Sequence, residues 1–250
     1  MPYFQIVSAT GKDDGVGLIG LGPNRGSNVR EALKSSAGNA VLDRIFLSDP
    51  STPNYLTTLL GRSDDPTDPY PGNITIGEVV PGFENITQTP KIPIAEVSVR
   101  EQGDQHWQVI LDQDGITGPD GKVINVTSIV DGGPRLNAVL DTGFSLSQVP
   151  RQLADAIYGK IPGAMFGDAG RGAGQTWMFP CEVEVNLTFR IGGVPYPIHP
   201  LDTSLKWSGN GTEFCIGSVS VFYLYPPHTS SNRPSRFSSS LGSLPMTTTT

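Results

Sequence analysis

The chain has 250 residues, of which only 16% are charged, and its net charge is −7. This length predicts one large domain or two small ones with a real core, and the acidic balance argues against a nucleic-acid or anionic-membrane partner. No apolar run approaches the roughly 18 residues that a transmembrane helix needs. Thirty glycines and 22 prolines suit many short strands joined by turns.

The first residues predict a strand over 3–9 and a glycine-rich segment after it. Residues 1–14 lack the basic and apolar regions of a signal peptide. Gly15 to Gly20, GVGLIG, fit the G-x-G-x-x-G pattern of a dinucleotide-binding turn. However, Asp13 and Asp14 would repel a pyrophosphate, and Pro23 would break the helix that such a turn must open. We therefore interpret these glycines as structural.

Residues 27–38, SNVREALKSSAG, predict a helix. Asn28 is the expected N-cap, Glu31 follows three residues later as in a capping box, and Gly38 ends the helix. Residues 39–100 alternate short apolar runs with turns rich in Pro, Gly, Asp and Asn, which predicts short strands and loops.

The second half of the chain gives clearer elements. Residues 106–124 predict strand, turn and strand, with the turn at residues 119–121. Residues 136–150 predict a buried strand that ends in a sharp turn. A helix is expected after Pro150, with Leu153, Ile157 and Ile161 on one face. Residues 181–200 predict two strands around a Gly192–Gly193 hairpin turn.

The last residues, 219–250, are rich in Ser and Thr and lack apolar periodicity. A chain of this composition cannot bury enough apolar surface to offset its ordering entropy. We expect a disordered tail, with a strand at most at residues 219–225, VSVFYLY.

Two kinds of residue indicate an oxidising compartment. Five asparagines open an N-x-[ST] sequon, where about two are expected by chance: Asn73, Asn85, Asn125, Asn186 and Asn210. The two cysteines, Cys181 and Cys215, are an even pair that can close a loop. They can equally be two unrelated buried thiols.

The stretch with the clearest chemistry is AVLDTGFS, residues 138–145. An aspartate at the end of a buried strand is costly unless it is hydrogen-bonded or catalytic. With Ala-Val-Leu before it and Ser145 after it, this Asp-Thr-Gly resembles the C-terminal-lobe catalytic motif of pepsin-like aspartic endopeptidases, the peptidase A1 family.

The resemblance extends over roughly residues 3–218 and is of the fungal type. Its other segments are DDGVGLIGLGPN, PGNITIGEV, HWQVILDQDGI, FPCEVEVNLTFRIGGVPYPIHP and EFCIGS. It implies an all-β, bilobal acid-protease fold with short helices. Residues 1–95 would be the later part of the N-terminal lobe, residues 96–218 most of the C-terminal lobe, and residues 219–250 the disordered tail.

The family's mechanism implies roles for the matching residues. Two aspartates, one from each lobe, share a proton and hold a water that attacks the scissile carbonyl; Asp141 would be the C-terminal-lobe member. Thr142 would tie the two active-site turns together, Gly143 would let the backbone approach, and Ser145 would hydrogen-bond the carboxylate. Phe144 departs from the family, which has Thr or a small residue there, and so alters the expected subsite shape.

The resemblance also implies a disulfide between Cys181 and Cys215, peptide or protein substrates, a monomer, and a secreted or secretory-pathway location. No nucleic acid, membrane, metal or cofactor is expected. His106, His199 and His228 have no metal-ligand spacing, and we interpret them as solvated or structural.

A second Asp-Thr-Gly or Asp-Ser-Gly is missing from the 250 residues, as are the expected flap and the apolar-apolar-Gly strand that would brace Asp141. We therefore expect a fragment, truncated at both ends, that is inactive as a single chain. Two alternatives stay open. One is a catalytically dead pepsin-like binding or inhibitor glycoprotein, and the other is a single-motif protease that works as a homodimer.

Overall fold

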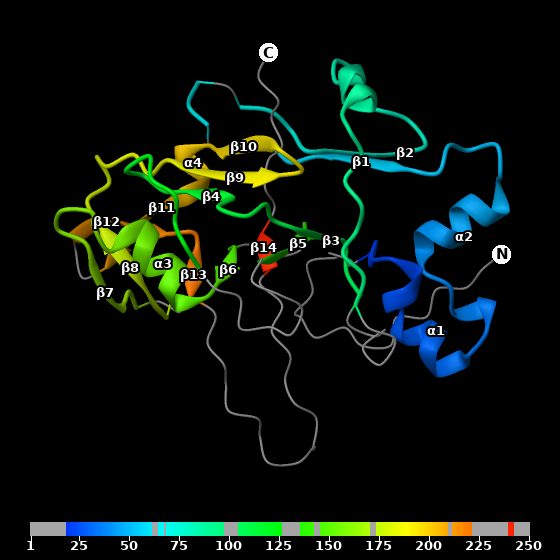
Figure 1. The fold of residues 1–250 in the computed structure, drawn as a ribbon, viewed down its shortest axis with the longest axis horizontal. Coiled ribbons are helices and arrows are strands. Elements are labelled where there is room, and N and C mark those ends of the chain that lie inside the picture. The colour runs from blue at the N-terminus through cyan, green and yellow to red at the C-terminus, as the bar shows by residue number, and fades with distance from the viewer. Residues whose placement is uncertain are drawn as a thin grey trace.

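A computed structural model describes residues 19–61, 65–67, 69–97, 105–126, 136–142, 146–170, 174–209, 212–221 and 240–242. The chain is mainly β with a few short helices, as the sequence predicts. In Figure 1 the N-terminal helices lie at the right and the strand-rich C-terminal part at the left. The predicted strand at 3–9 and most of the G-x-G-x-x-G segment lie outside the described residues.

The N-terminal part is built from short elements around one hairpin. In chain order they are η1 (Asn24–Gly26), α1 (Asn28–Leu33), η2 (Ser36–Gly38), α2 (Val41–Ser48), β1 (Leu56–Leu59), β2 (Asn73–Ile76) and η3 (Glu84–Gln88). Strands β1 and β2 are antiparallel and pair only with each other among the described strands. A two-stranded sheet of this kind is marginally stable on its own.

The predicted helix at 27–38 is shorter than expected and has a different cap. Ser27, not Asn28, is the N-cap, and its hydroxyl accepts from the Arg30 amide. The helix ends at Leu33 because Lys34 adopts a left-handed conformation, with φ of 47°. Helix α2 was not predicted: its N-cap, Ala40, offers no side-chain acceptor, so the usual sequence signal for a helix start is absent.

The described residues of the C-terminal part form four small sheets and two helices. Its elements are β3 (Gln108–Ile110), β4 (Ile116–Thr117), β5 (Asn137–Asp141), β6 (Gln148–Val149), α3 (Arg151–Tyr158), β7 (Met165–Asp168), β8 (Gln175–Phe179), β9 (Leu187–Ile191), β10 (Val194–Ile198), α4 (Pro200–Thr203), β11 (Ser204–Gly209), β12 (Thr212–Gly217), β13 (Ser220–Val221) and β14 (Ser240–Gly242). The strand orders are β10-β9-β4, β11-β12-β8-β7, β13-β6 and β14-β5-β3.

Two local predictions are confirmed in this part. The Gly121 amide donates to the Gly118 carbonyl at 3.0 Å, which closes the predicted turn. Strands β9 and β10 form the predicted hairpin, whose Gly192 and Gly193 have φ of 60° and 83°. The carboxylate of Asp112 accepts from both glycine amides, at 2.9 and 2.7 Å. That contact anchors the hairpin turn to the chain just after β3.

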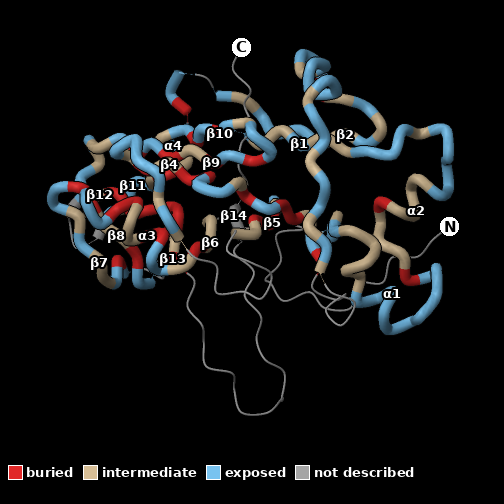
Figure 2. Tube along the Cα trace, viewed as in Figure 1, coloured by how far each residue is buried: buried red, intermediate tan, exposed pale blue. Residues whose placement is uncertain are grey.

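Helix α3 is also confirmed. It follows Pro150, and Leu153 and Ile157 on its face are buried, but it ends at Tyr158, so that Ile161 is buried beyond the helix and not on it. The main core cluster, to which they belong, draws all its buried members from residues 109–221, as the concentration of red in the left part of Figure 2 shows. In residues 19–97 the buried apolar side chains are Leu42 and Val80. The domain boundary at residues 95–96 stays a prediction.

The expectation of an irregular tail is wrong at one place. Ser240–Gly242 forms β14, which pairs in parallel with β5. Strand β13, at Ser220–Val221, lies within the one segment where a strand was allowed, and it pairs in parallel with β6. Among the described helices, none has the length and apolar character needed to cross a lipid bilayer.

Candidate active site

Asp141 is the last residue of β5, and two neighbouring strands, β3 and β14, pair with that strand. Ala138 and Val139, just before it, are buried in the C-terminal part. Strand β3 pairs antiparallel with β5, and the Leu140 amide donates to the Trp107 carbonyl at 2.7 Å. The carboxylate therefore stands at the end of a paired, core-anchored strand, on a partly exposed residue.

Strand β14 holds the other edge of β5. Leu241 lies opposite Leu140, and Gly242 lies opposite Asp141. Strand β14 also contacts β6, which follows the Asp-Thr-Gly turn. From the sequence, no strand was expected to brace Asp141, and this expectation is wrong: a Ser-Leu-Gly segment pairs there, in place of the apolar-apolar-Gly segment of the family.

The chain after the motif is fixed in the same way. The Ser220 amide donates to the Ser147 carbonyl at 2.7 Å, and Val221 lies opposite Val149 in the β6–β13 pair. Thr142 is exposed. Gly143, Phe144 and Ser145 lie outside the described residues, so their expected roles stay predictions.

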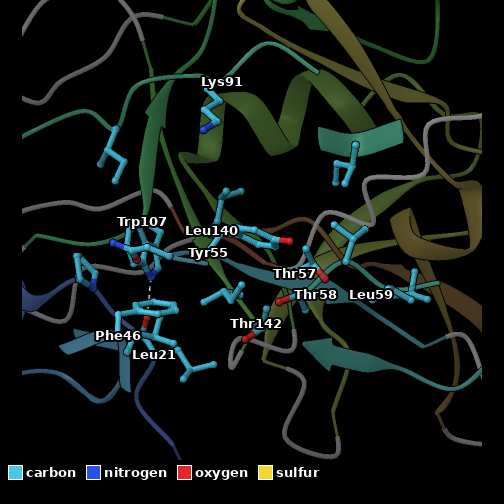
Figure 3. A pocket seen from close by; sticks show the side chains of 18 of the residues that line it. Leu21, Phe46, Tyr55, Thr57, Thr58, Leu59, Lys91, Trp107, Leu140 and Thr142 are labelled. Carbon is cyan, nitrogen blue, oxygen red and sulfur yellow. Dashed lines mark hydrogen bonds between the residues drawn. The ribbon is translucent and has the colours of Figure 1, made fainter. Parts of the chain in front are cut away.

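A groove of about 1140 Å³ runs along Asp141 and Thr142. In Figure 3, Trp107, Leu21 and Phe46 lie on one side of the view and Thr57, Thr58 and Leu59 of β1 on the other. The charged residues in its wall are Asp43, Lys91 and Asp141, whereas most of the lining is apolar: Leu21, Pro23, Leu42, Phe46, Leu47, Tyr55, Leu56, Leu59, Leu60, Val79, Val80, Phe83, Ile86, Ile92, Ile94, Trp107 and Leu140. An apolar groove with few polar groups is typical of a ligand-binding site.

Two contacts tie the N-terminal segment to chain segments beside β3: one to the residue just before that strand, the other to residues 91–97, from which the Ala95 amide donates to the Gln108 carbonyl. The indole Nε1 of Trp107 donates to the Leu21 carbonyl at 2.7 Å, which is the dashed line in Figure 3. Arg25 pairs with Glu96 at 2.7 Å on the surface. Neither contact is visible in the sequence. Trp107 lies only in a segment with strand-like alternation, and nothing local shows that its indole reaches across 86 residues.

The structure joins Cys181 and Cys215 in a disulfide with a Cα–Cα distance of 4.9 Å. Cys215 is buried in β12, while Cys181 lies between β8 and β9. The pairing is the one that the family resemblance implies. Within the described residues, no group of three or more His, Cys, Asp or Glu side chains could hold a metal ion.

A comparison with protein-family models matches residues 71–234 to the eukaryotic aspartyl protease family. The chain belongs to this family. The match includes the Asp141 motif, both cysteines and the whole C-terminal core.

Curated relatives are fungal and similar over a limited region. Major aspartyl peptidase 1 of Cryptococcus neoformans is 30% identical over 122 residues, which is 49% of this chain and 24% of that protein. Aspartic-type endopeptidase ctsD of Aspergillus fumigatus is 28% identical over 97 residues, 39% of this chain and 18% of that protein. The chain thus matches a quarter or less of the length of these relatives.

Proposed function

We propose that this chain is part of an aspartic endopeptidase and that Asp141 supplies one of its two catalytic carboxylates. The observation that carries the proposal is the position of Asp141. It ends a core strand that is paired on both edges, and it lies in the wall of the groove. Both relatives are named as aspartic peptidases, and peptide or protein substrates follow from that class.

In the proposed mechanism Asp141 and a second carboxylate hold one water and share one proton. One carboxylate takes a proton from the water as the water attacks the scissile carbonyl, and the other gives a proton to the carbonyl oxygen. The strands on both edges of β5 would keep Asp141 in position, which matters because a displacement of about 1 Å can cost about a hundredfold in rate.

The 250 residues contain a single Asp-Thr-Gly. We propose that the second carboxylate comes from another polypeptide segment, as the two-lobe arrangement of the family implies. The 250-residue chain alone is then expected to be inactive, because general acid–base assistance worth about 10²–10⁴-fold per group is missing. A secretory-pathway or vacuolar location belongs to the same proposal, and the disulfide supports it.

The test compares two proteins on casein between pH 3 and 5. One is the 250-residue chain, and the other is the same chain fused behind the N-terminal half of a pepsin-like protease, which carries its own Asp-Thr-Gly. We expect cleavage by the fusion only. Asp141→Asn should lower the cleavage rate of the fusion by at least about 100-fold. Asp114→Asn is the control, because Asp114 is exposed and its left-handed backbone, with φ of 55°, suits Asn equally well.

Other results of this test would favour one of the two alternative functions or overturn the role of Asp141. The 250-residue chain alone could cleave casein, lose that activity with Asp141→Asn, and show a rate that rises more steeply than the protein concentration. This result would favour a homodimeric protease. A fusion that binds a statine-type peptide but cleaves nothing would favour a pepsin-like binding protein. Cleavage that Asp141→Asn leaves intact would overturn the role of Asp141.

A further inference from the structure

Four of the five sequon asparagines lie in the described part of the chain, and all four side chains are exposed. They are Asn73 at the start of β2, Asn85 in η3, Asn125 after β4 and Asn186 just before β9. None of them makes a side-chain hydrogen bond to another described residue. Five sequons exceed the roughly two expected by chance from the Ser and Thr content.

Two asparagines outside the sequons, Asn24 and Asn39, use their side-chain amides within the fold. The side-chain oxygen of Asn24 accepts from the Ala40 amide at 2.9 Å, which ties η1 to the start of α2. The side chain of Asn39 accepts from the Arg30 guanidinium. Asn28 and Asn54 are exposed and make no side-chain hydrogen bond to a described residue, as the four sequon asparagines do, but neither of the two stands in a sequon.

The four sequons fall into two pairs according to their middle residue. In Asn125-Val126-Thr127 and Asn186-Leu187-Thr188 the middle side chain packs in or against the core. In Asn73-Ile74-Thr75 and Asn85-Ile86-Thr87 it is exposed, by 53% for Ile74 and 44% for Ile86. The second pair therefore stands beside apolar surface, and Asn73 lies on a strand whose outer edge has no described partner.

None of the four asparagines lines the groove, although Phe83 and Ile86, on either side of Asn85, do. Glycans at these positions would stand outside the groove and at its rim. An open strand edge beside exposed isoleucines is a recognised template for intermolecular pairing. A bulky, hydrated group next to it would hinder such pairing.

We propose that Asn73, Asn85, Asn125 and Asn186 carry N-linked glycans, and that those at Asn73 and Asn85 keep the β1–β2 hairpin from self-associating. The donor is a lipid-linked pyrophosphate oligosaccharide. A bond forms between the asparagine Nδ2 and the sugar C1, the bond between C1 and the pyrophosphate breaks, and the amide loses one proton while the lipid pyrophosphate leaves.

The first experiment directs the 250-residue chain into the secretory pathway of a yeast. The purified protein is treated with peptide-N-glycosidase in ¹⁸O-labelled water, and its peptides are analysed by mass spectrometry. We expect the heavy-oxygen aspartate mark at all four positions. An asparagine that stays unmarked overturns the assignment at that position. This measurement does not depend on protease activity, so its result tests glycosylation separately from the catalytic role of Asp141.

The second experiment compares two double variants that each remove two glycans. Asn73→Gln with Asn85→Gln is expected to shift the protein to larger species in size-exclusion chromatography with light scattering. Asn125→Gln with Asn186→Gln is expected to leave its size equal to that of the unaltered chain after correction for glycan mass. Endoglycosidase H treatment of the unaltered folded protein, which leaves one sugar at each site, should also promote association. Equal behaviour of the two double variants would overturn the shielding role.

Discussion

Tyr158 offers the sharpest test of how the C-terminal core is held together. Its side chain is fully buried at the end of α3 and stacks on Phe179 with ring centroids 5.4 Å apart. Its hydroxyl donates to the Thr203 carbonyl at 2.7 Å and accepts from the Val219 amide at 3.1 Å. The hydroxyl thus joins α3, the end of α4 and the chain entering β13.

Tyr158→Phe keeps the ring and its packing but removes both hydrogen bonds. The Thr203 carbonyl still accepts from the Ser218 amide at 3.2 Å, so it loses only one of its two hydrogen bonds. The Val219 amide is left without its partner in a buried position. A buried group left unsatisfied costs about 1–3 kcal/mol. We therefore expect the free energy of unfolding to fall by about 2 kcal/mol.

The assay is urea denaturation of the disulfide-bonded chain, followed by tryptophan fluorescence, with Tyr196→Phe as the control. Tyr196 is in β10 with 9% of its surface exposed, and its hydroxyl bonds to no other described residue. Loss of the Tyr196 hydroxyl should change the free energy of unfolding by less than about 0.5 kcal/mol. Equal effects of the two variants would refute the argument that the Tyr158 hydroxyl stabilises the core.

The same group gives a pH dependence. Burial raises the pKa of the Tyr158 hydroxyl above its ordinary value, so the folded chain keeps a proton that the unfolded chain loses above about pH 10. The stabilisation is then fully present below that pH and declines as the pH rises above it. The stability difference between the unaltered chain and Tyr158→Phe should shrink from pH 9 to pH 11; a constant difference would contradict this.

Two further predictions concern the disulfide and the packing around Tyr158. Replacing Cys181 and Cys215 together by Ala should lower the free energy of unfolding by about 3–4 kcal/mol, because the bond closes a loop with a sequence separation of 34; two reactive thiols in the denatured, unreduced parent would show that the bond is absent. Gly217→Ala should cost about 1–3 kcal/mol by overpacking, because its Cβ would lie 2.6 Å from Cε2 of Tyr158. Gly20→Ala, whose Cβ would meet nothing within 4 Å, should show no such loss, and thermal unfolding of the two variants compares them directly.

Local signals in the sequence were sufficient where an element is stabilised by its own neighbours. The Gly192–Gly193 turn requires positive φ at both residues, which glycine adopts without strain. Helix α3 has a proline just before its first residue and an apolar face of regular spacing. Such features depend on residues a few positions apart, so they are visible in the chain itself.

The predictions were wrong or incomplete where a contact from elsewhere decides the structure. Helix α2 has no capping side chain, and Leu42 and Phe46 instead line the groove shared with residues of β1 and β5. Ser27 displaces Asn28 as the cap of α1, and the Ser27 hydroxyl also donates to the Gly38 carbonyl at 3.0 Å. That second bond folds residues 27–38 back on themselves, and a straight twelve-residue helix would not allow it.

Strand β14 is the element that the sequence could least predict. Its three residues, Ser-Leu-Gly, are too few to show an apolar period, and they lie in a segment of low apolar content. Parallel pairing needs a long crossover connection, and here the partner, β5, precedes β14 by about a hundred residues. The hydrogen-bonding groups along β5 are satisfied on one edge by β3 and on the other by β14, which is the requirement that buried backbone imposes. Because Gly242 is the residue opposite Asp141, the pairing brings a strand beside the carboxylate without adding a side chain next to it. The position of Asp141 is therefore determined by two segments, one of which gives no sequence signal of its own.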